Sequence, residues 1–114
     1  MPSRQVVAKE LADIFSVLSH PDRIRMIEEL RVGEKDVTSL AKELGLETPR
    51  VSQHLRLLRM QGVVIERREG RRHFYHLNNP EMATWIVQGL TFIEQRMAGV
   101  TKSNIKAARR LWSE

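Results

Sequence analysis

The chain has 114 residues, no cysteine and a formal net charge of +5. This length can bury one modest hydrophobic core but not two, so we expect a single domain over residues 1–114. The absence of cysteine excludes disulfides, thiol redox switching and thiolate metal sites. The basic balance favours a polyanionic partner, which includes nucleic acid but also an acidic membrane or protein.

Hydrophobic residues make up 41% of the chain and aromatic residues only 5%, which indicates a globular protein packed with aliphatic side chains. No apolar run approaches the roughly 18 to 20 residues that cross a bilayer. The first residues, MPSRQVVAKE, lack the basic-then-apolar layout of a signal peptide. We therefore expect a cytoplasmic protein.

Two amphipathic helices are predicted before residue 34. Apolar side chains recur at helical spacing over residues 5–18 and define a first helix. Ser19 and Asp22 have the spacing of a capping box, and Pro21 is placed early, so a second helix should begin here. Its apolar residues continue to a stop near Gly33.

A helix-turn-helix is predicted next, over residues 37–60. Asp36 can cap a short helix, and Gly45 follows it where a left-handed residue is wanted. Thr48 and Pro49 then predict another helix start, because a threonine hydroxyl can cap free amides and proline loses nothing at the first helical position. Two short helices joined by a glycine-containing turn form this motif.

The second helix of this motif has an apolar back and a polar front. Val51, Leu55 and Leu58 fall on one stripe. The opposite side carries Arg50, Ser52, Gln53 and Arg56. Such a front is suited to a DNA major groove, where these side chains reach phosphates and base edges. The alternative is an ordinary solvated helix face.

A β-hairpin with a basic tip is predicted over residues 63–77. Residues 63–65 are β-branched, and residues 73–77 alternate, with Tyr75 and Leu77 on one face. A lone hairpin is marginal, so it should lie against the helices and complete a winged helix-turn-helix. The wing arginines expected to reach DNA phosphates, rather than to form a merely solvated turn, are Arg68, Arg71 and Arg72.

A long apolar helix is predicted after Pro80. Its near-heptad face and an adjoining aromatic face expose more apolar surface than a lone helix leaves in water, so we expect a partner. Gly99 interrupts this helix, and residues 101–112 predict a last basic helix. Trp85, Phe92 and Trp112 fit either a dimer core or an effector pocket.

Three segments resemble the ArsR/SmtB family of bacterial winged-helix repressors: LSHPDRIRMIEEL (18–30), TSLAKELGLETPRVSQHLRLLRMQGVV (38–64) and RREGRRHFYHL (67–77). The resemblance implies a mainly α fold with a small β-hairpin. It also implies a homodimer that binds an imperfect palindrome and releases it when an effector binds.

The resemblance places DNA contacts on Thr48, Pro49, Ser52 and Gln53. The residue pattern adds Arg50 and Arg56, and also His54, which either contacts phosphate or forms a hydrogen bond within the unit. The dimer interface implied by the first helix and the long C-terminal helix comprises Val7, Leu11, Phe15, Met82, Trp85, Ile86, Leu90, Ile93 and Met97.

Two familiar inducer sites of the family are missing from this sequence. No cysteine lies near the end of the second helix, and residues 79–99 contain no histidine. The four histidines, His20, His54, His73 and His76, form no pair at a spacing of four. We therefore expect polar or packing histidines, no bound metal, no cofactor and an effector that needs no thiol.

Catalytic motifs are also missing, since the sequence has no nucleophile turn and no glycine-rich phosphate loop. We predict a DNA-binding repressor and not an enzyme. Two alternatives remain: a protein-interaction module with weak DNA binding, and a metal-responsive repressor whose histidine, aspartate or glutamate ligands come from two subunits. The basic helix near the C-terminus fits either a solvated face or an additional DNA contact.

Overall fold

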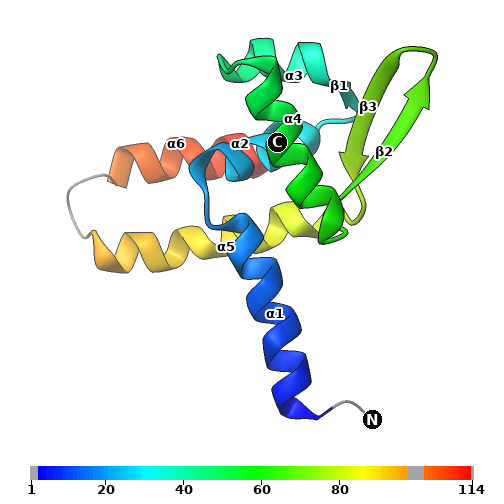
Figure 1. Ribbon diagram of the computed structural model, residues 1–114. Coiled ribbons are helices and arrows are strands. Elements are labelled where there is room, and N and C mark those ends of the chain that lie inside the picture. The colour runs from blue at the N-terminus through cyan, green and yellow to red at the C-terminus, as the bar shows by residue number, and fades with distance from the viewer. Residues whose placement is uncertain (1–2, 98–101, 114) are drawn as a thin grey trace. The chain divides into compact units, whose positions relative to one another are not determined.

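The computed structural model describes residues 3–97 and 102–113 (Figure 1). Its elements are α1 (Arg4–Leu18), α2 (Pro21–Leu30), β1 (Lys35–Asp36), α3 (Val37–Leu44), α4 (Thr48–Met60), β2 (Val64–Glu69), β3 (Arg72–Leu77), α5 (Glu81–Arg96) and α6 (Lys102–Ser113). The chain divides into two compact units, Met1–Asn79 and Pro80–Glu114. That all 114 residues act as one domain stays a prediction. No helix in the described ranges is long and apolar enough to cross a bilayer.

The first unit is built around an aliphatic core. The side chains that are fully buried there come from α2, α3, α4 and β2, and they are Met26, Ile27, Leu40, Val51, Leu55, Leu58 and Val64. Each such side chain contributes roughly 1.5–3 kcal/mol when it leaves water. The apolar back predicted for α4 is therefore confirmed, and it fixes which side of this helix remains exposed.

The helix-turn-helix forms as predicted, with one difference at the start of α4. Gly45 has the left-handed conformation (φ 69°), and its N–H bonds to carbonyls in the last turn of α3. The cap of α4 is Glu47, whose backbone is extended and whose carbonyl accepts from the Val51 N–H at 3.1 Å. Thr48 is thus the first helical residue and not the cap, and Pro49 follows inside the first turn.

The start of α2 differs from the predicted capping box. His20 is the cap, and its Nδ1 accepts from the Asp22 backbone N–H at 3.1 Å. The Ser19 hydroxyl instead donates to the Ser16 carbonyl at 2.7 Å, which satisfies the end of α1. Pro21 is the first helical residue, as expected. An imidazole at this cap brings a metal-binding side chain to the junction between α1 and α2.

The wing belongs to a three-stranded antiparallel sheet in the order β1-β3-β2. Strands β2 and β3 pair in register with Val64 opposite Leu77 and Glu66 opposite Tyr75. Tyr75 and Leu77 are both buried, as their alternation predicted. The sequence analysis missed β1, because a strand of two residues carries no recognisable alternation. In Figure 1 the hairpin lies beside α4, and α1 extends away from both.

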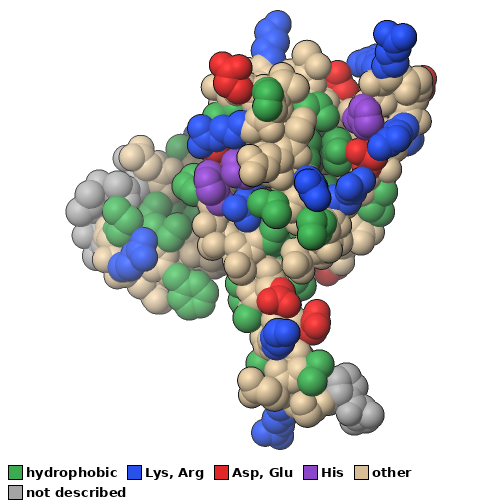
Figure 2. Space-filling view, viewed as in Figure 1, with side chains coloured by type: hydrophobic (Ala, Val, Ile, Leu, Met, Phe, Trp, Pro, Cys, Tyr) green, Lys and Arg blue, Asp and Glu red, His purple; other side chains and the backbone are tan. Residues whose placement is uncertain are grey.

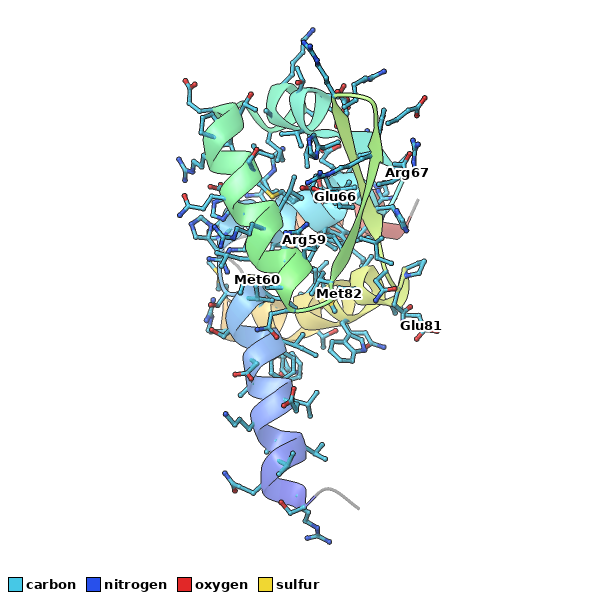
Figure 3. All side chains as sticks on the ribbon, turned by 45° about the vertical axis from the view of Figure 1, so that its right-hand side comes forward. Arg59, Met60, Glu66, Arg67, Glu81 and Met82 are labelled. Carbon is cyan, nitrogen blue, oxygen red and sulfur yellow. The ribbon has the colours of Figure 1, made fainter. Side chains whose placement is uncertain are left out.

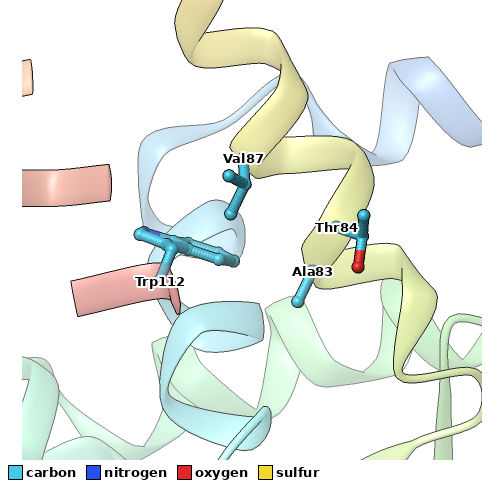
Figure 4. Close-up of a pocket in the computed structure, with 4 residues that line it drawn as sticks. All are labelled: Ala83, Thr84, Val87 and Trp112. Atoms are coloured by element: carbon cyan, nitrogen blue, oxygen red, sulfur yellow. The ribbon is translucent and has the colours of Figure 1, made fainter. Parts of the chain in front are cut away.

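The second unit consists of α5 and α6. An ion pair of 2.7 Å between Arg109 Nη1 and Glu94 Oε1 joins the two helices. A cavity of about 360 Å³ lies between them, and Figure 4 shows the side chains that line it, which are Ala83, Thr84, Val87 and Trp112. Both predicted C-terminal helices are present, whereas the predicted interruption at Gly99 lies outside the described residues.

Candidate nucleic-acid interface

The outer surface of α4 presents six exposed residues that we call the α4 front. They are Thr48, Pro49, Arg50, Ser52, Gln53 and Arg56. The buried back of the same helix holds this surface outward. Figure 2 shows Lys and Arg side chains over the face that presents α4 and the hairpin, with His side chains close to them. The α4 front therefore offers hydrogen-bond donors and acceptors and positive charge to a polyanion.

Arg50 is the member of the α4 front that is tied to another helix. Its Nη2 lies 2.6 Å from Asp22 Oδ2 at the start of α2, although 55% of the Arg50 side chain remains exposed. Gln53 and Arg56 are both exposed. The α4 front thus combines one braced guanidinium with side chains that are available to a ligand.

His54 lies in the interior and not on the α4 front. Its residue is only 8% exposed, its Nδ1 accepts from Arg23 Nε at 3.2 Å, and its Nε2 lies 3.4 Å from Asp22 Oδ2. Burial, followed by the charges of His20 and Arg23, lowers the pKa of His54 below its usual 6.5. Of its two predicted roles, bonding within the unit fits this position. We therefore remove His54 from the predicted DNA contacts.

Glu66 anchors the wing to α4. The Tyr75 hydroxyl donates to Glu66 Oε2 at 2.6 Å. Arg59 Nη1 of α4 lies 3.5 Å from Glu66 Oε1, and Figure 3 labels both of these residues. Hydrogen bonding, above all from Tyr75, lowers the pKa of Glu66 to about 2. The sequence analysis missed this residue. Its only sequence signal is an acidic residue at an inward position of a predominantly basic hairpin.

The wing arginines have different surroundings. Arg67 binds Glu34 with contacts as short as 2.7 Å and lies over the Phe74 ring, 4.5 Å from its centroid, so it holds the hairpin together. Arg72 is on the same face, where its Nη2 lies 3.6 Å from Asp36 Oδ2. Arg71 is exposed at the tip and forms no ion pair with a residue that the structure describes.

Arg68 lies on the opposite face of the hairpin from Arg67 and pairs with Glu66 at 3.2 Å. Its side chain is nevertheless largely exposed. Because strand side chains alternate, Arg68 shares its face with the residues that meet α4. Arg68 and Arg71 are thus the wing cations best placed beside the α4 front. The DNA contact of Arg72 stays a prediction, and its guanidinium already lies near Asp36.

The predicted dimer contacts remain accessible in the single chain. Along α1, Val7, Leu11 and Phe15 share one face and are exposed, and Trp85 of α5 is exposed as well. The other predicted contacts are Met82, Ile86, Leu90 and Ile93 on α5 and Met97 directly after it, and all are partly exposed. Exposed apolar faces on both helices are compatible with a partner, and the dimer contacts themselves stay predictions.

These features define a winged helix-turn-helix, in which a polar helix front lies beside a basic hairpin. Comparison with known proteins shows which family of winged helix-turn-helix proteins the chain resembles. The family described as bacterial regulatory protein, arsR family, matches residues 20–66. The arsenical resistance operon repressor of Staphylococcus xylosus is 32% identical over 99 residues, which are 87% of this chain and 94% of that protein.

Two solved structures have the same fold. The transcriptional repressor BigR from Xylella fastidiosa has a TM-score of 0.67 and 32% identity, with 80% of this chain and 96% of that chain covered. A homodimeric winged helix-turn-helix DNA-binding domain from Mycobacterium bovis has a TM-score of 0.72, covers 85% of this chain and 91% of its own, and is 22% identical. The latter likeness supports the fold alone.

The chain belongs to the arsR family of bacterial regulatory proteins. It is a DNA-binding transcriptional repressor with a mainly helical winged helix-turn-helix fold, as predicted. Proteins of this family regulate transcription and are not enzymes, in agreement with the sequence-based prediction.

Proposed function

We propose that the chain acts in the cytoplasm as a homodimer that represses transcription by binding a palindromic operator. Two α4 fronts, related by the dimer axis, enter successive major grooves roughly 34 Å apart. Gln53 and Ser52 read base edges, while Arg50, Arg56, Arg68 and Arg71 approach phosphates. Thr48 and Pro49 place the backbone of the first turn near the DNA.

The main support for this proposal is that α4 is buried on one side and exposed on the other. The back of the helix is fully buried, so the α4 front cannot turn inward without breaking the core. Packing of the aliphatic side explains why α4 forms, but it does not explain why the exposed side carries Arg, Ser and Gln beside a basic hairpin. Family membership supports DNA as the polyanion that this surface meets.

Release from the operator requires an effector that binds more tightly to a dimer whose two α4 helices are at a different distance from each other than in the DNA-bound dimer. The effector is not captured by thiolates, because the chain contains no cysteine. The cavity lined by Trp112, Ala83, Thr84 and Val87 is a candidate place for a small apolar ligand. We propose that such a ligand acts through α5 and α6.

Selection from a library of random DNA duplexes tests the proposal. The full chain is immobilised, bound duplexes are amplified over several rounds, and the enriched sequences are aligned. We expect an inverted repeat whose half-sites lie about one helical turn apart. Light scattering on the same sample should give twice the mass of the chain. Enrichment of no common sequence, or of a single half-site by a monomer, would overturn the proposal.

A further inference from the structure

Within the described residues, one group of side chains has the composition of a metal site. His20 and Asp22 at the start of α2, together with His54 of α4, each place one potential ligand atom within 4.8 Å of the other two. We call this group the HDH cluster. All three residues are buried or half-buried, so the ligand atoms are held by the fold and not by flexible surface chains.

One distance inside the HDH cluster matches that between two ligands of a first-row metal ion, and the others require small side-chain movements. Four ligands at the usual 2.0–2.1 Å around a tetrahedral ion lie roughly 3.3 Å from one another. The His54 Nε2 to Asp22 Oδ2 distance is 3.4 Å, and the His20 Nδ1 to Asp22 Oδ2 distance is 3.9 Å. The two imidazole rings are tilted by 55° with centroids 4.5 Å apart, so neither ring is stacked flat against the other.

In the metal-free protein these side chains have other partners. The Asp22 backbone N–H donates to His20 Nδ1 at 3.1 Å, and two arginines contact Asp22 and His54. Arg50 Nη2 lies 2.6 Å from Asp22 Oδ2, and Arg23 Nε donates to His54 Nδ1 at 3.2 Å. Because His54 Nδ1 accepts, its proton is on Nε2, which faces Asp22. A metal at Nε2 moves that proton to Nδ1 and therefore displaces Arg23 from it. The ion also takes Asp22 Oδ2 from Arg50.

We propose that His20, Asp22 and His54 bind one divalent transition metal ion per chain, and that the bound ion frees Arg50 to contact DNA. Two imidazoles and one carboxylate suit Zn²⁺, Co²⁺ or Ni²⁺ and not Mg²⁺ or Ca²⁺, which prefer oxygen ligands. Three protein ligands leave a fourth position for water. This inference revises the sequence-based expectation that the histidines bind no metal.

The direction of the effect follows from charge. In the metal-free protein the Asp22 carboxylate holds the Arg50 guanidinium and neutralises it. Metal binding replaces that partner with a dication close to the α4 front, so the net positive charge facing the phosphates rises. The ion is therefore a co-repressor, distinct from the effector that releases the operator. This coupling rests on the proposed function, whereas metal binding itself does not.

The ion can displace Arg50 from Asp22 because 55% of the Arg50 side chain is exposed, so water can solvate the released guanidinium. The Asp22 side chain is only 19% exposed, and its carboxylate gains the ion as a new partner when Arg50 leaves. Removing Arg23 from His54 leaves it bound to the Val17 carbonyl through Nη1 at 2.8 Å, so its guanidinium retains one strong partner. An ion on His20 Nδ1 also displaces the Asp22 backbone N–H from this nitrogen, so the rearrangement includes the cap of α2 as well as the side chains at the contact between α2 and α4.

The test begins with metal binding by the full chain without DNA. The protein is freed of metal with a chelator and titrated with CoCl₂, and the visible absorption of tetrahedral Co²⁺ is followed. We expect saturation at one Co²⁺ per chain and loss of the band when ZnCl₂ is added. Absence of this band, together with absence of Zn²⁺ binding by calorimetry, would overturn the site.

Variants assign the ligands. His20→Asn removes one imidazole but keeps a side-chain oxygen that can cap α2, so the fold should survive. It is expected to weaken Co²⁺ binding by at least about tenfold. The matched control is His76→Asn on β3, which should bind Co²⁺ as the unaltered chain does. Equal weakening by both variants, with circular dichroism unchanged, would reject the assignment.

The coupling is measured as DNA affinity with and without Zn²⁺, on the duplex selected from the random library. We expect about three- to tenfold tighter binding with Zn²⁺, from one or two added phosphate contacts. His20→Asn should not respond. Metal binding without a change in DNA affinity would overturn the coupling and leave the site standing. Failure of the metal-free chain to bind any selected duplex would instead count against the proposed function.

Discussion

The Tyr75 hydroxyl donates a hydrogen bond to Glu66 Oε2 at 2.6 Å, and the two residues face each other directly across β2 and β3. The carboxylate also lies 3.5 Å from Arg59 of α4 through its other oxygen. One acidic side chain therefore fixes the register of the wing and its distance from the helix that meets DNA.

Replacing Tyr75 with Phe removes that hydrogen bond while the buried ring keeps its volume. Because the bond is made to a charged acceptor, we expect the free energy of unfolding to fall by about 1.5–3 kcal/mol. Urea denaturation followed by circular dichroism measures this loss. Glu66→Gln is the companion variant, since its amide oxygen still accepts from Tyr75. A Tyr75→Phe variant as stable as the parent would contradict this role of the hydrogen bond.

Acid should destabilise the protein partly through Glu66. Its pKa is lowered from 4.5 to about 2 in the folded chain, so the unfolded chain binds the proton first as the pH falls. The stabilisation is complete above 4.5 and is lost as the pH falls from there to about 2. Urea denaturation at a series of pH values should show a steeper loss for the parent than for Glu66→Gln. Parallel curves would mean that other carboxylates account for the acid sensitivity.

Local periodicity was enough to predict most of the fold. The stripe of Val51, Leu55 and Leu58, the left-handed Gly45 and the buried Tyr75 all follow from spacing and from backbone chemistry within a few residues. These features depend on neighbours along the chain, so the sequence contains the information needed to place them.

The features that could not be predicted join distant segments. Asp22 and His54 are far apart in sequence, and only the packing of α2 against α4 brings them to 3.4 Å. A search for histidines at helical spacing misses such a pair, because its members lie on different helices. The Glu66 contact with Arg59 is hidden for the same reason, since it depends on how the hairpin folds back onto α4.

Variants of the α4 front and of the wing should affect DNA binding differently, because the first removes a base contact and the second a phosphate contact. Gln53→Ala removes an amide that can bond two atoms of an adenine edge, so we expect about 1–3 kcal/mol less discrimination between selected and scrambled duplexes. Arg71→Ala should weaken binding to both duplexes alike. In a dimer it should also reduce the slope of log affinity against log salt by about two, one for each lost phosphate contact.

Arg25→Ala on α2 is the matched control for Arg71→Ala, because it removes the same charge from an exposed position outside the α4 front and the wing. Fluorescence anisotropy at several salt concentrations gives both quantities. Equal salt slopes for Arg25→Ala and Arg71→Ala would mean that the wing contributes only its general charge. An unchanged preference in Gln53→Ala would remove that residue from base recognition.

Dimer formation should depend on one face of α1. Val7 and Leu11 are exposed in the single chain and are one helical turn apart, so a partner helix would cover them together. A carboxylate buried without a counter-charge in such an interface is strongly unfavourable. We therefore expect Leu11→Glu to shift the protein from dimer to monomer in light scattering. Operator binding should then weaken, because each monomer engages only one half-site.

Ser16→Glu supplies the control for Leu11→Glu. Ser16 is exposed on the side of α1 roughly opposite Val7, so the same negative charge is added outside the predicted interface. This variant should remain dimeric and keep its operator affinity within about twofold, since surface substitutions usually change stability by no more than 0.5 kcal/mol. If Leu11→Glu were dimeric as well, α1 would lie outside the interface, and the α5 face that includes Trp85 would have to join the two copies without it.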